Sequence, residues 1–522
     1  MELDRVASAT IWTRRRFLAS VGALAAGGIG IAALADLVAA PPRTGLIAAA
    51  SPPAGAPGRH SFRSRADLTP PVVTIAGRRG RADGIYTFLT PANGAQPDGP
   101  MIIDGAGDLV WLRPSAKGVA ATDLHVVEYS GASALVWWEG ALNSGIGAGE
   151  FVLVDESYRP AGRISAGNGR QADLHELLLT SRGTALLFAD SALTGPIYGH
   201  PTDTPWPIMD CAVQEIDLAT GRVVFEWRSS EHIGLDESFV GPPTGAAQVY
   251  DYVHGNAIDE DSDGNLLVSA RNTSTIYKVD RQTGDILWRL GGKRSDIRVA
   301  PEASFGWQHD VRRRFDGTIT MFDNGASEAP GRSRGLRIRV DESAGTASLV
   351  EAYDHPDGLL STSQGNVQLL ADGGVFVGWG SKPFFSEYGP DGTLVLDATF
   401  PASTQSYRDY RQAWTARPYE LPTLALGGPG GGSPRSGAAA SASASGGSRT
   451  VYASWNGATG IGSWQVLTGE ALSDLRVVAG APRSGFETAI TAPTLGAYVA
   501  VRAHDELGGL LGMSVPVAVP AS

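Results

Sequence analysis

Four of the nine histidines stand at nearly the same phase of a repeated turn-and-strand element. Each lies six to nine residues before a polar turn: His125, His175, His254 and His309. A single histidine before a strand is usually a surface or capping residue, but four at one phase indicate a shared site. Grouped imidazoles can bind a metal, transfer protons or act as nucleophiles near neutral pH.

The metal option has little local support in the sequence. No stretch has the HExxH spacing of a zinc site. Asp259, Asp261 and Asp263 resemble the opening of a calcium loop, but the twelfth position is Ala270, where a bidentate glutamate is needed. We therefore expect a hairpin turn here, with calcium as the alternative, and we predict neither a metal nor a nucleotide cofactor.

Two alternating elements must position these histidines. One is a polar turn ending in glycine before a β-rich run that often holds an aromatic residue, as in 104–111, 217–227 and 280–288. The other is a turn followed directly by a strand, as in 263–268 and 316–321. Asp-Gly turns flanked by β-branched and apolar residues are typical of hairpins. Each unit therefore holds two hairpins.

The period of the repeat predicts the architecture. Five steps lead from Gly107 to Gly392 over 285 residues, or 57 residues per step. About four short strands per unit is the content of one propeller blade, and six units close a ring. We predict an all-β fold with a six-bladed β-propeller over residues 60–426, and a pair of β-sandwiches is the alternative. Equivalent positions of the blades surround the channel, where the histidines would meet.

The C-terminal part differs in composition. Residues 427–448 are rich in Gly, Ser and Ala and are predicted to be a linker. Residues 449–522 contain short alternating strands and are predicted to form a small fibronectin type III-like β-sandwich. Such a domain usually binds or positions a partner rather than performing chemistry.

The N-terminus carries an export signal by its pattern. Residues 13–18 fit the twin-arginine motif, and an uncharged Ala/Gly-rich stretch follows over 17–35. We assign residues 1–40 to this signal and 41–59 to a flexible leader. The protein is then exported by the twin-arginine machinery to the periplasm, the cell envelope or the medium. An uncleaved anchor is the alternative, because 19 residues are just long enough to span a bilayer.

Charge and cysteine content exclude other classes. The formal net charge of -12 argues against a nucleic-acid partner. Cys211 is the only cysteine, so no intramolecular disulfide and no multi-cysteine metal site can form. We expect Cys211 to be a buried structural thiol, with a nucleophilic role as the alternative. The sequence does not indicate the oligomeric state.

Three segments resemble the bacterial aryl sulfotransferase family, whose members use no nucleotide sulfate donor. Residues 253–258 hold His-Gly-Asn and are followed by an arginine at the end of 267–271. Residues 305–309 end in Trp-Gln-His, and 173–177 read Asp-Leu-His-Glu-Leu. The resemblance extends over about residues 60–420 and is to a divergent branch of the family.

The resemblance implies a reaction and its residues. A sulfuryl group moves from a phenolic sulfate ester to the enzyme and then to a phenolic acceptor, through a sulfohistidine intermediate. His309 takes the sulfuryl group, while His254, His175 and Arg271 bind the sulfate oxygens and stabilise the transition state. Another histidine protonates the departing phenolate.

Three further residues are assigned to substrate binding. Asn256 orients a neighbouring imidazole or the sulfate, and Trp307 and Trp379 stack on an aryl ring, with core packing as the alternative for both tryptophans. His125 is predicted to share only the phase of the other histidines. Two other functions stay open: a non-catalytic propeller that binds a ligand or protein, and a hydrolase or lyase that uses the same pocket.

Overall fold

The computed structural model describes residues 58–77, 84–93, 96–143, 145–200, 204, 206–245, 248–325, 331–427 and 448–520. The predicted signal, nearly all of the predicted leader and most of the predicted linker lie outside these residues. Strands dominate the described chain, and its helices are three 3-10 turns: η1 (Ser229–Glu231), η2 (Leu235–Glu237) and η3 (Pro301–Ala303). The predicted all-β class is confirmed. Within the described ranges, no helix is long and apolar enough to cross a membrane.

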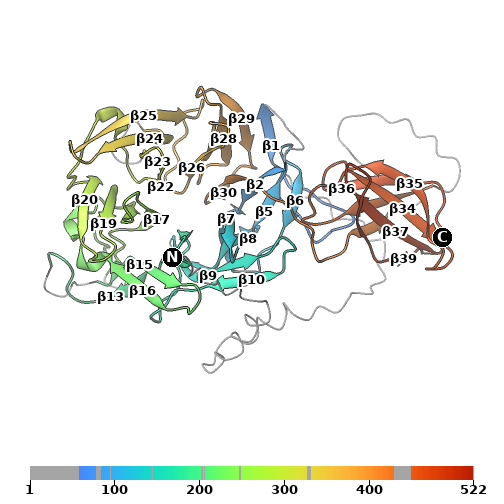
Figure 1. The fold of residues 1–522 in the computed structure, drawn as a ribbon, viewed down its shortest axis with the longest axis horizontal. Helices are drawn as coiled ribbons and strands as arrows, with labels where there is room; N and C mark the ends of the chain where they lie inside the picture. Colours follow the sequence, from blue (N-terminus) through green and yellow to red (C-terminus); the bar gives the residue numbers. More distant parts are fainter. Residues whose placement is uncertain are drawn as a thin grey trace, which may run out of the picture. The chain divides into compact units, whose positions relative to one another are not determined.

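Six antiparallel sheets of four or more strands follow one another between β1 and β31, as Figure 1 shows. The first sheet has the strand order β31 (Tyr410–Ala413), β2 (Ile85–Leu89), β5 (Met101–Ile103), β6 (Leu109–Leu112). The second has the order β7 (Ala120–Tyr129), β8 (Ala132–Asn143), β9 (Ile146–Val154), β10 (Pro160–Ile164). The third has the order β11 (Leu177–Leu179), β12 (Thr184–Phe188), β15 (Ala212–Asp217), β16 (Val223–Arg228). The fourth sheet has the order β17 (Gly255–Glu260), β18 (Leu266–Ala270), β19 (Thr275–Val279), β20 (Ile286–Gly291). The fifth has the order β22 (His309–Arg313), β23 (Thr318–Asp323), β24 (Arg334–Asp341), β25 (Thr346–Asp354). The sixth has the order β26 (Asn366–Leu369), β27 (Val375–Gly378), β28 (Phe384–Tyr388), β29 (Leu394–Thr399).

Short strands extend or connect these sheets. Fifth strands are added by β1 (Thr74–Gly77) beside β29 and by β21 (Arg298–Val299) beside β25. Two small sheets complete the set: β13 (Ser191–Leu193) with β14 (Ile208–Asp210), and β30 (Thr404–Ser406) with β3 (Pro91–Asn93) and β4 (Gln96–Pro97).

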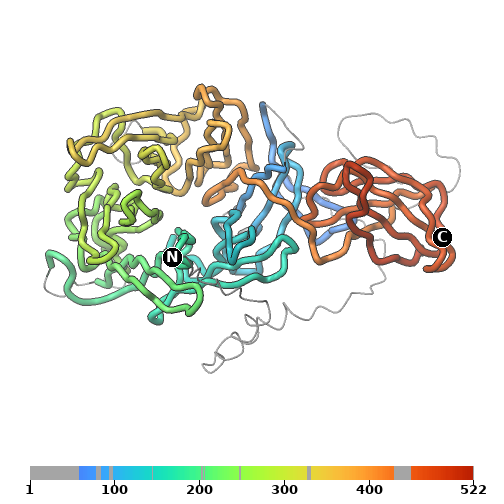
Figure 2. Tube along the Cα trace, viewed as in Figure 1, coloured from blue at the N-terminus to red at the C-terminus, as the bar shows by residue number. Residues whose placement is uncertain are grey.

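The two ends of this region are tied together by strand pairing. β31 pairs antiparallel with β2, so one sheet combines segments more than 300 residues apart in the chain. β1 likewise pairs with β29. In Figure 2 the orange chain of β31 runs beside the blue chain of β2. This pairing covers the edge of β2 and joins the two ends of the region in one sheet.

Hydrogen bonds link the first strands of neighbouring sheets in a complete cycle. The links are Thr122 Oγ1 to Leu174 O (3.4 Å), Ile258 N–H to Glu176 Oε2 (3.3 Å), Asn256 Nδ2 to Gln308 O (2.7 Å), Val367 N–H to Asp310 Oδ2 (3.0 Å), Asp409 N–H to Asn366 Oδ1 (3.0 Å) and Val126 N–H to Gln412 Oε1 (2.7 Å). In each link a side chain bonds a backbone group of the neighbouring sheet or of the residues that lead into it. The start of one sheet is thereby fixed relative to the next.

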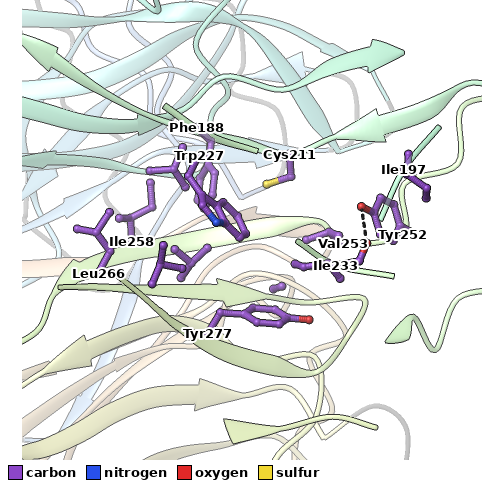
Figure 3. Close-up of a cluster of buried hydrophobic side chains, with 14 of the residues drawn as sticks. Phe188, Ile197, Cys211, Trp227, Ile233, Tyr252, Val253, Ile258, Leu266 and Tyr277 are labelled. Carbon is purple, nitrogen blue, oxygen red and sulfur yellow. Dashed lines mark hydrogen bonds between the residues drawn. The ribbon is translucent and has the colours of Figure 1, made fainter. Parts of the chain in front are cut away.

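Apolar layers fill the space between adjacent sheets. Figure 3 shows one such layer, in which Phe188, Cys211 and Trp227 lie beside Ile258 and Tyr277. Cys211 is fully buried and free, which confirms the predicted structural thiol. Burial, together with the nearby acidic groups, raises the pKa of this thiol well above its usual range. A thiol in this state is a poor nucleophile.

The C-terminal strands form two sheets around a shared core. One contains β32 (Thr423–Leu426), β33 (Arg449–Ser454) and β36 (Glu487–Ala492). The other contains β35 (Arg476–Pro482), β34 (Ser463–Gly469), β37 (Tyr498–His504), β38 (Leu510–Met513) and β39 (Val517–Ala518). Val451 and Trp464 are buried between the two sheets. Because β32 pairs with β33, this pair of sheets begins before the Gly/Ser/Ala-rich segment rather than after it.

Candidate active site

A hairpin brings His254 and Arg271 together. His254 directly precedes β17, and Arg271 directly follows β18, which pairs antiparallel with β17. The two residues therefore lie at the same end of the hairpin, and the Arg271 N–H donates to the His254 carbonyl at 2.9 Å. The seventeen-residue spacing in the sequence is the length of this hairpin.

The same construction recurs in two other sheets. His309 is the first residue of β22, and Asn324 directly follows β23. The Nδ1 atom of His309 lies 2.7 Å from the Oδ1 atom of Asn324. His175 precedes β11 by two residues, and Asp190 follows β12 by two. Each histidine thus has a counterpart at the end of the next strand: Arg271, Asn324 or Asp190.

The ends of these hairpins meet at one large cavity of about 1370 Å³. His175, His254, His309 and Arg271 all line it, so the structure brings together the four residues predicted to be catalytic. The rings of His175 and His254 meet edge to face, with centroids 4.8 Å apart. The other lining residues include apolar and aromatic ones, such as Leu142, Met209, Val249, Tyr250 and Tyr407, and polar ones, such as Asp190, Asp251 and Gln248. The cavity therefore combines a cationic and imidazole-rich end with apolar walls.

His309 is held in a defined tautomer. Its Nδ1 atom lies 3.0 Å from the Trp307 carbonyl and 2.7 Å from Asn324 Oδ1, and both of these oxygens are acceptors. Nδ1 must therefore carry the proton. Nε2 then has a lone pair, and it accepts the backbone N–H of Gln364 at 3.1 Å.

The surroundings also keep His309 uncharged. Burial lowers the pKa of this imidazole well below its usual range, and the positive charge of Arg271 lowers it further. The hydrogen bond that His309 donates to Asn324 Oδ1 opposes the shift but does not cancel it. An imidazole with a lowered pKa is unprotonated at neutral pH, so its Nε2 lone pair is available once the Gln364 N–H is displaced.

His175 and His254 have a different kind of partner. The Nδ1 atom of His254 lies 2.5 Å from Asp251 Oδ2, and the Nδ1 atom of His175 contacts Asp173 Oδ1. Asp173 also accepts the N–H of Gly147 at 2.6 Å. Burial would raise the pKa of Asp173, but the charge and hydrogen bond of His175 lower it below its usual value. The carboxylates fix both rings with Nδ1–H inward, which leaves Nε2 for a ligand.

Arg271 is held at the cavity wall by three contacts. Its guanidinium lies over the ring of Trp307 at 4.1 Å from the centroid. It also donates to Asn272 Oδ1 at 2.8 Å and to the Thr362 carbonyl at 3.1 Å. Burial lowers the pKa of this arginine, but a guanidinium remains charged in proteins. These contacts leave other donors of the fork for an anion.

The backbone around the cavity is strained. His254, Trp307 and Gln364 adopt left-handed conformations with φ of 55°, 55° and 66°. Such conformations cost about 1–3 kcal/mol each in residues other than glycine and persist only where the surroundings enforce them. Their concentration beside three cavity residues marks the site as one built for function.

A model of the arylsulfotransferase (ASST) family matches residues 125–401, which is more than half of the chain and contains every histidine of the site. The chain belongs to the arylsulfotransferase family. The resemblance found in the sequence is thereby confirmed at the level of the family.

Solved structures similar to this arylsulfotransferase-family chain are distant in sequence. A protein of unknown function from Bacteroides caccae shares 14% identity with a TM-score of 0.38, over 62% of this chain and 98% of its own. A catalytically inactive virginiamycin B lyase from Staphylococcus aureus with quinupristin shares 10% identity with a TM-score of 0.33, over 64% and 88%. AztD from Citrobacter koseri shares 10% with a TM-score of 0.30, over 64% and 99%. A search of curated proteins finds no match.

The three residues predicted to bind substrate contact other parts of this protein. Asn256 is fully buried, and its amide donates to the Gln308 carbonyl, next to His309, rather than lining the cavity. Trp307 supports Arg271 through its ring. Trp379 is fully buried against Phe322, donates to Ser386 Oγ at 2.9 Å and does not line the cavity. For Trp379 the structure favours the alternative of core packing.

His125 also stays outside the cavity. Its Nδ1 atom lies 2.8 Å from the Asp123 carbonyl, and its ring packs near Tyr410. The longer strands β7 and β8 continue past this position, so no hairpin end faces it as in the other sheets. It shares the phase of the other histidines but not their cavity.

The aspartates that resemble a calcium loop are occupied by basic groups. Asp261 accepts from Arg313 Nε at 2.8 Å and pairs with Lys278 Nζ at 3.1 Å. Lys278 also pairs with Asp263 at 2.8 Å, and Asp259 accepts the Arg313 N–H at 2.6 Å. Among the residues that the structure describes, no group of His, Cys, Asp or Glu has the geometry of a metal site.

Sequence analysis missed the residues that act on the imidazoles. Asp173 lies two residues before His175, and Asp251 lies three before His254, so short acid–histidine spacings carried a signal. Asn324 and Gln364 had none, because they reach His309 from separate strands and loops. Tyr407, whose hydroxyl donates to the His175 carbonyl at 3.1 Å, comes from more than 200 residues away.

Proposed function

We propose that this protein is an aryl sulfotransferase that moves a sulfuryl group from a phenolic sulfate ester to a phenolic acceptor through a sulfohistidine at His309. One observation carries the proposal: a neutral imidazole with Nε2 unprotonated lines a cavity beside a charged arginine and two further imidazoles. Membership of the arylsulfotransferase family supports the same reaction class.

The first half-reaction uses these groups as follows. Arg271, His175 and His254 bind the sulfate oxygens of the donor, and the arginine fork suits an oxyanion. His309 Nε2 attacks sulfur, the N–S bond forms, and the bond from sulfur to the phenolic oxygen breaks. The phenolic oxygen departs with the electron pair of the broken S–O bond and leaves a sulfuryl group on the imidazole.

The second half-reaction returns the enzyme to its starting state. An acceptor phenol enters the vacated part of the cavity, and its oxygen attacks the sulfur on His309. Apolar and aromatic walls such as Leu142, Val249 and Tyr250 suit the aryl rings of both substrates. Binding of donor and acceptor at one place in turn gives ping-pong kinetics.

Mass spectrometry tests the proposal directly. Incubation with 4-nitrophenyl sulfate in the absence of acceptor should add one sulfonyl group to the peptide that contains His309. The His309→Ala variant should show no adduct and lose turnover by about 10³-fold or more. Product formation without an adduct, or a fully active His309→Ala variant, contradicts the proposal.

Two other functions give different results in the same assay. A non-catalytic binding protein would bind an aryl sulfate saturably and release no phenol. A hydrolase would release inorganic sulfate at a rate independent of an acceptor phenol, and a lyase would leave the aryl sulfate intact, because its aromatic ring offers no β-proton for elimination. Analysis of sulfated acceptor with and without added phenol separates all three from a sulfotransferase.

We also propose that the six sheets form a six-bladed β-propeller over residues 60–422 and that the C-terminal sheets form a fibronectin type III-like domain. The cyclic hydrogen bonds between first strands and the pairing of β31 with β2 support the propeller. Export by the twin-arginine route is a further proposal, supported by the motif at residues 13–18. Replacement of Arg14 and Arg15 by lysine should retain the protein in the cytoplasm.

A further inference from the structure

Besides Asp251, a second acidic side chain lines the cavity and has no role in the steps above. Asp190 follows β12 by two residues, near the hairpin end where Arg271 directly follows β18 and Asn324 directly follows β23. Arg271 lines the cavity, and Asn324 contacts the imidazole of His309. Asp190 therefore shares one cavity with His175, His254, His309 and Arg271.

Asp190 lies among carboxylates that already have partners. Asp173 and Asp251 hold the Nδ1 atoms of His175 and His254. Asp190 forms no ion pair within the part of the chain that the structure describes. The neighbouring Arg170 is engaged elsewhere, because it donates to the Ala189 carbonyl and pairs with Asp210.

These surroundings favour the protonated acid. Burial raises the pKa of Asp190 well above its usual range, and repulsion from Asp173 and Asp251 raises it further. The Cys211 thiol and the Ala212 amide oppose the shift without cancelling it. The protonated form of Asp190 is therefore favoured far more than in an ordinary aspartate.

Unsatisfied oxygens support the same protonation state. Oδ1 of Asp190 and Oδ1 of Asp251 are both buried, and neither has a hydrogen-bond partner among the described residues. A buried acceptor without a partner is costly, and the cost is greatest when the group is charged. A proton on Asp190 removes one negative charge from this cluster.

We propose that Asp190 is the acid–base residue that exchanges the phenolic proton in both half-reactions. As the bond between sulfur and the phenolic oxygen of the donor breaks, the Asp190 O–H gives its proton to that oxygen, and a neutral phenol leaves. As the acceptor phenol attacks the sulfur on His309, its O–H proton returns to the Asp190 carboxylate. No proton is gained or lost over the cycle. The inference rests on the sulfuryl transfer proposed above.

This assignment divides the labour among the groups that line the cavity. An imidazole that donates to a sulfate oxygen keeps its proton throughout the reaction, whereas a general acid must release it. His175 and His254 serve the first task through a proton on Nε2, because their Nδ1–H groups are already donated to carboxylates. Asp190 is suited to the second because its surroundings favour the protonated form and it lines the same cavity.

A series of aryl sulfates tests the role through leaving-group dependence. A general acid helps most when the phenol is a poor leaving group and least when the phenolate is stable alone. Asp190→Asn keeps the shape and the neutral charge of the side chain but has no transferable acid proton. With phenyl sulfate we expect kcat/KM to fall about 10²-fold, whereas with 4-nitrophenyl sulfate we expect a fall within about threefold.

The controls separate this role from a structural one. Asp190→Glu should restore part of the phenyl sulfate activity, and thermal unfolding should show that both variants remain folded. Equal losses with every donor, or no loss with any, overturn the assignment of Asp190 while the His309 adduct still forms. Failure of the unaltered protein to transfer sulfate from any aryl sulfate overturns both proposals.

Discussion

Three histidines stand at the starts of their hairpins, yet two of them have a different kind of partner from the third. His175 and His254 present Nδ1 to a carboxylate, which fixes the orientation of each ring. His309 presents Nδ1 to the amide oxygen of Asn324 and to a backbone carbonyl, and neither partner carries charge. On this difference in the partner of Nδ1 we base the proposal of two anion-binding imidazoles and one nucleophile.

The positive charge of Arg271 sharpens the contrast. It lowers the pKa of His309, while the repeated aspartates offset positive charge near the other two rings. In the proposed reaction one arginine therefore has two effects, since it would bind the sulfate and it lowers the pKa of the proposed nucleophile. The repeated hairpin places a histidine at its start in three sheets. The side chains beside each histidine give the three rings different partners.

The largest expected loss of activity comes from replacing the carboxylate that holds His254, one of the two histidines paired with an aspartate. In Asp251→Asn, His254 loses the carboxylate that orients its ring, and the amide can favour the wrong tautomer. We expect kcat/KM for an aryl sulfate to fall about 100-fold. Steady-state kinetics across pH measure the loss.

Asp357→Asn is a matched control for this variant. Asp357 lies 4.0 Å from His355, and neither residue lines the cavity. Its removal should leave kcat/KM within about twofold. Similar losses in the two variants would show that the Asp251–His254 pair has no special role in catalysis.

The second effect comes from giving His309 the kind of partner that the other histidines have. Asn324→Asp places a carboxylate at Nδ1 and should raise the pKa of His309. The Nε2 lone pair is then lost below the raised pKa, so activity at pH 7 should fall about 10-fold and recover as the pH increases. The measurement is the pH dependence of kcat/KM.

Asn324→Ala isolates the effect of charge. It removes the same donors to the Ser361 and Gln364 carbonyls as Asn324→Asp but adds no carboxylate. We expect a loss of activity without an upward shift of the acidic limb. If both variants show the same pH profile, the partner of Nδ1 does not set the protonation of His309.

The smallest effect on catalysis is expected at Trp379. Because its ring packs against Phe322 and away from the cavity, Trp379→Phe should lower the free energy of unfolding by about 1–3 kcal/mol. The KM for aryl sulfates should stay within about twofold, as measured alongside chemical denaturation. A large rise in KM with unchanged stability would return Trp379 to the substrate site.

Much of the site could be read from the repeat alone. His175, His254 and His309 share a phase of the repeat because each stands at the start of a hairpin. The length of the β17–β18 hairpin sets the number of residues between His254 and Arg271. The same phase included His125, which lies outside the cavity because β7 and β8 are longer. The phase of a residue in the repeat predicts its position along its own strand, but it does not predict where the neighbouring strand ends.

Polar and aromatic residues with several possible uses were harder to place. Trp379 and Asn256 have residue types suited to a substrate site, yet one packs in the core and the other holds a backbone carbonyl. Asp190 drew no notice, because an isolated aspartate after a strand is common. Its importance follows from the acidic groups that the fold assembles around it.

The sequence by itself determined the all-β class, the repeating hairpins, the family, and the four side chains His175, His254, His309 and Arg271 as members of one site. These features depend on local periodicity and on motifs within single hairpins. Only the tertiary structure showed that the pKa of His309 is lowered and that the pKa of Asp190 is raised. Both depend on burial and on charges brought from distant strands, and pKa values are set by that three-dimensional environment rather than by neighbours in the chain.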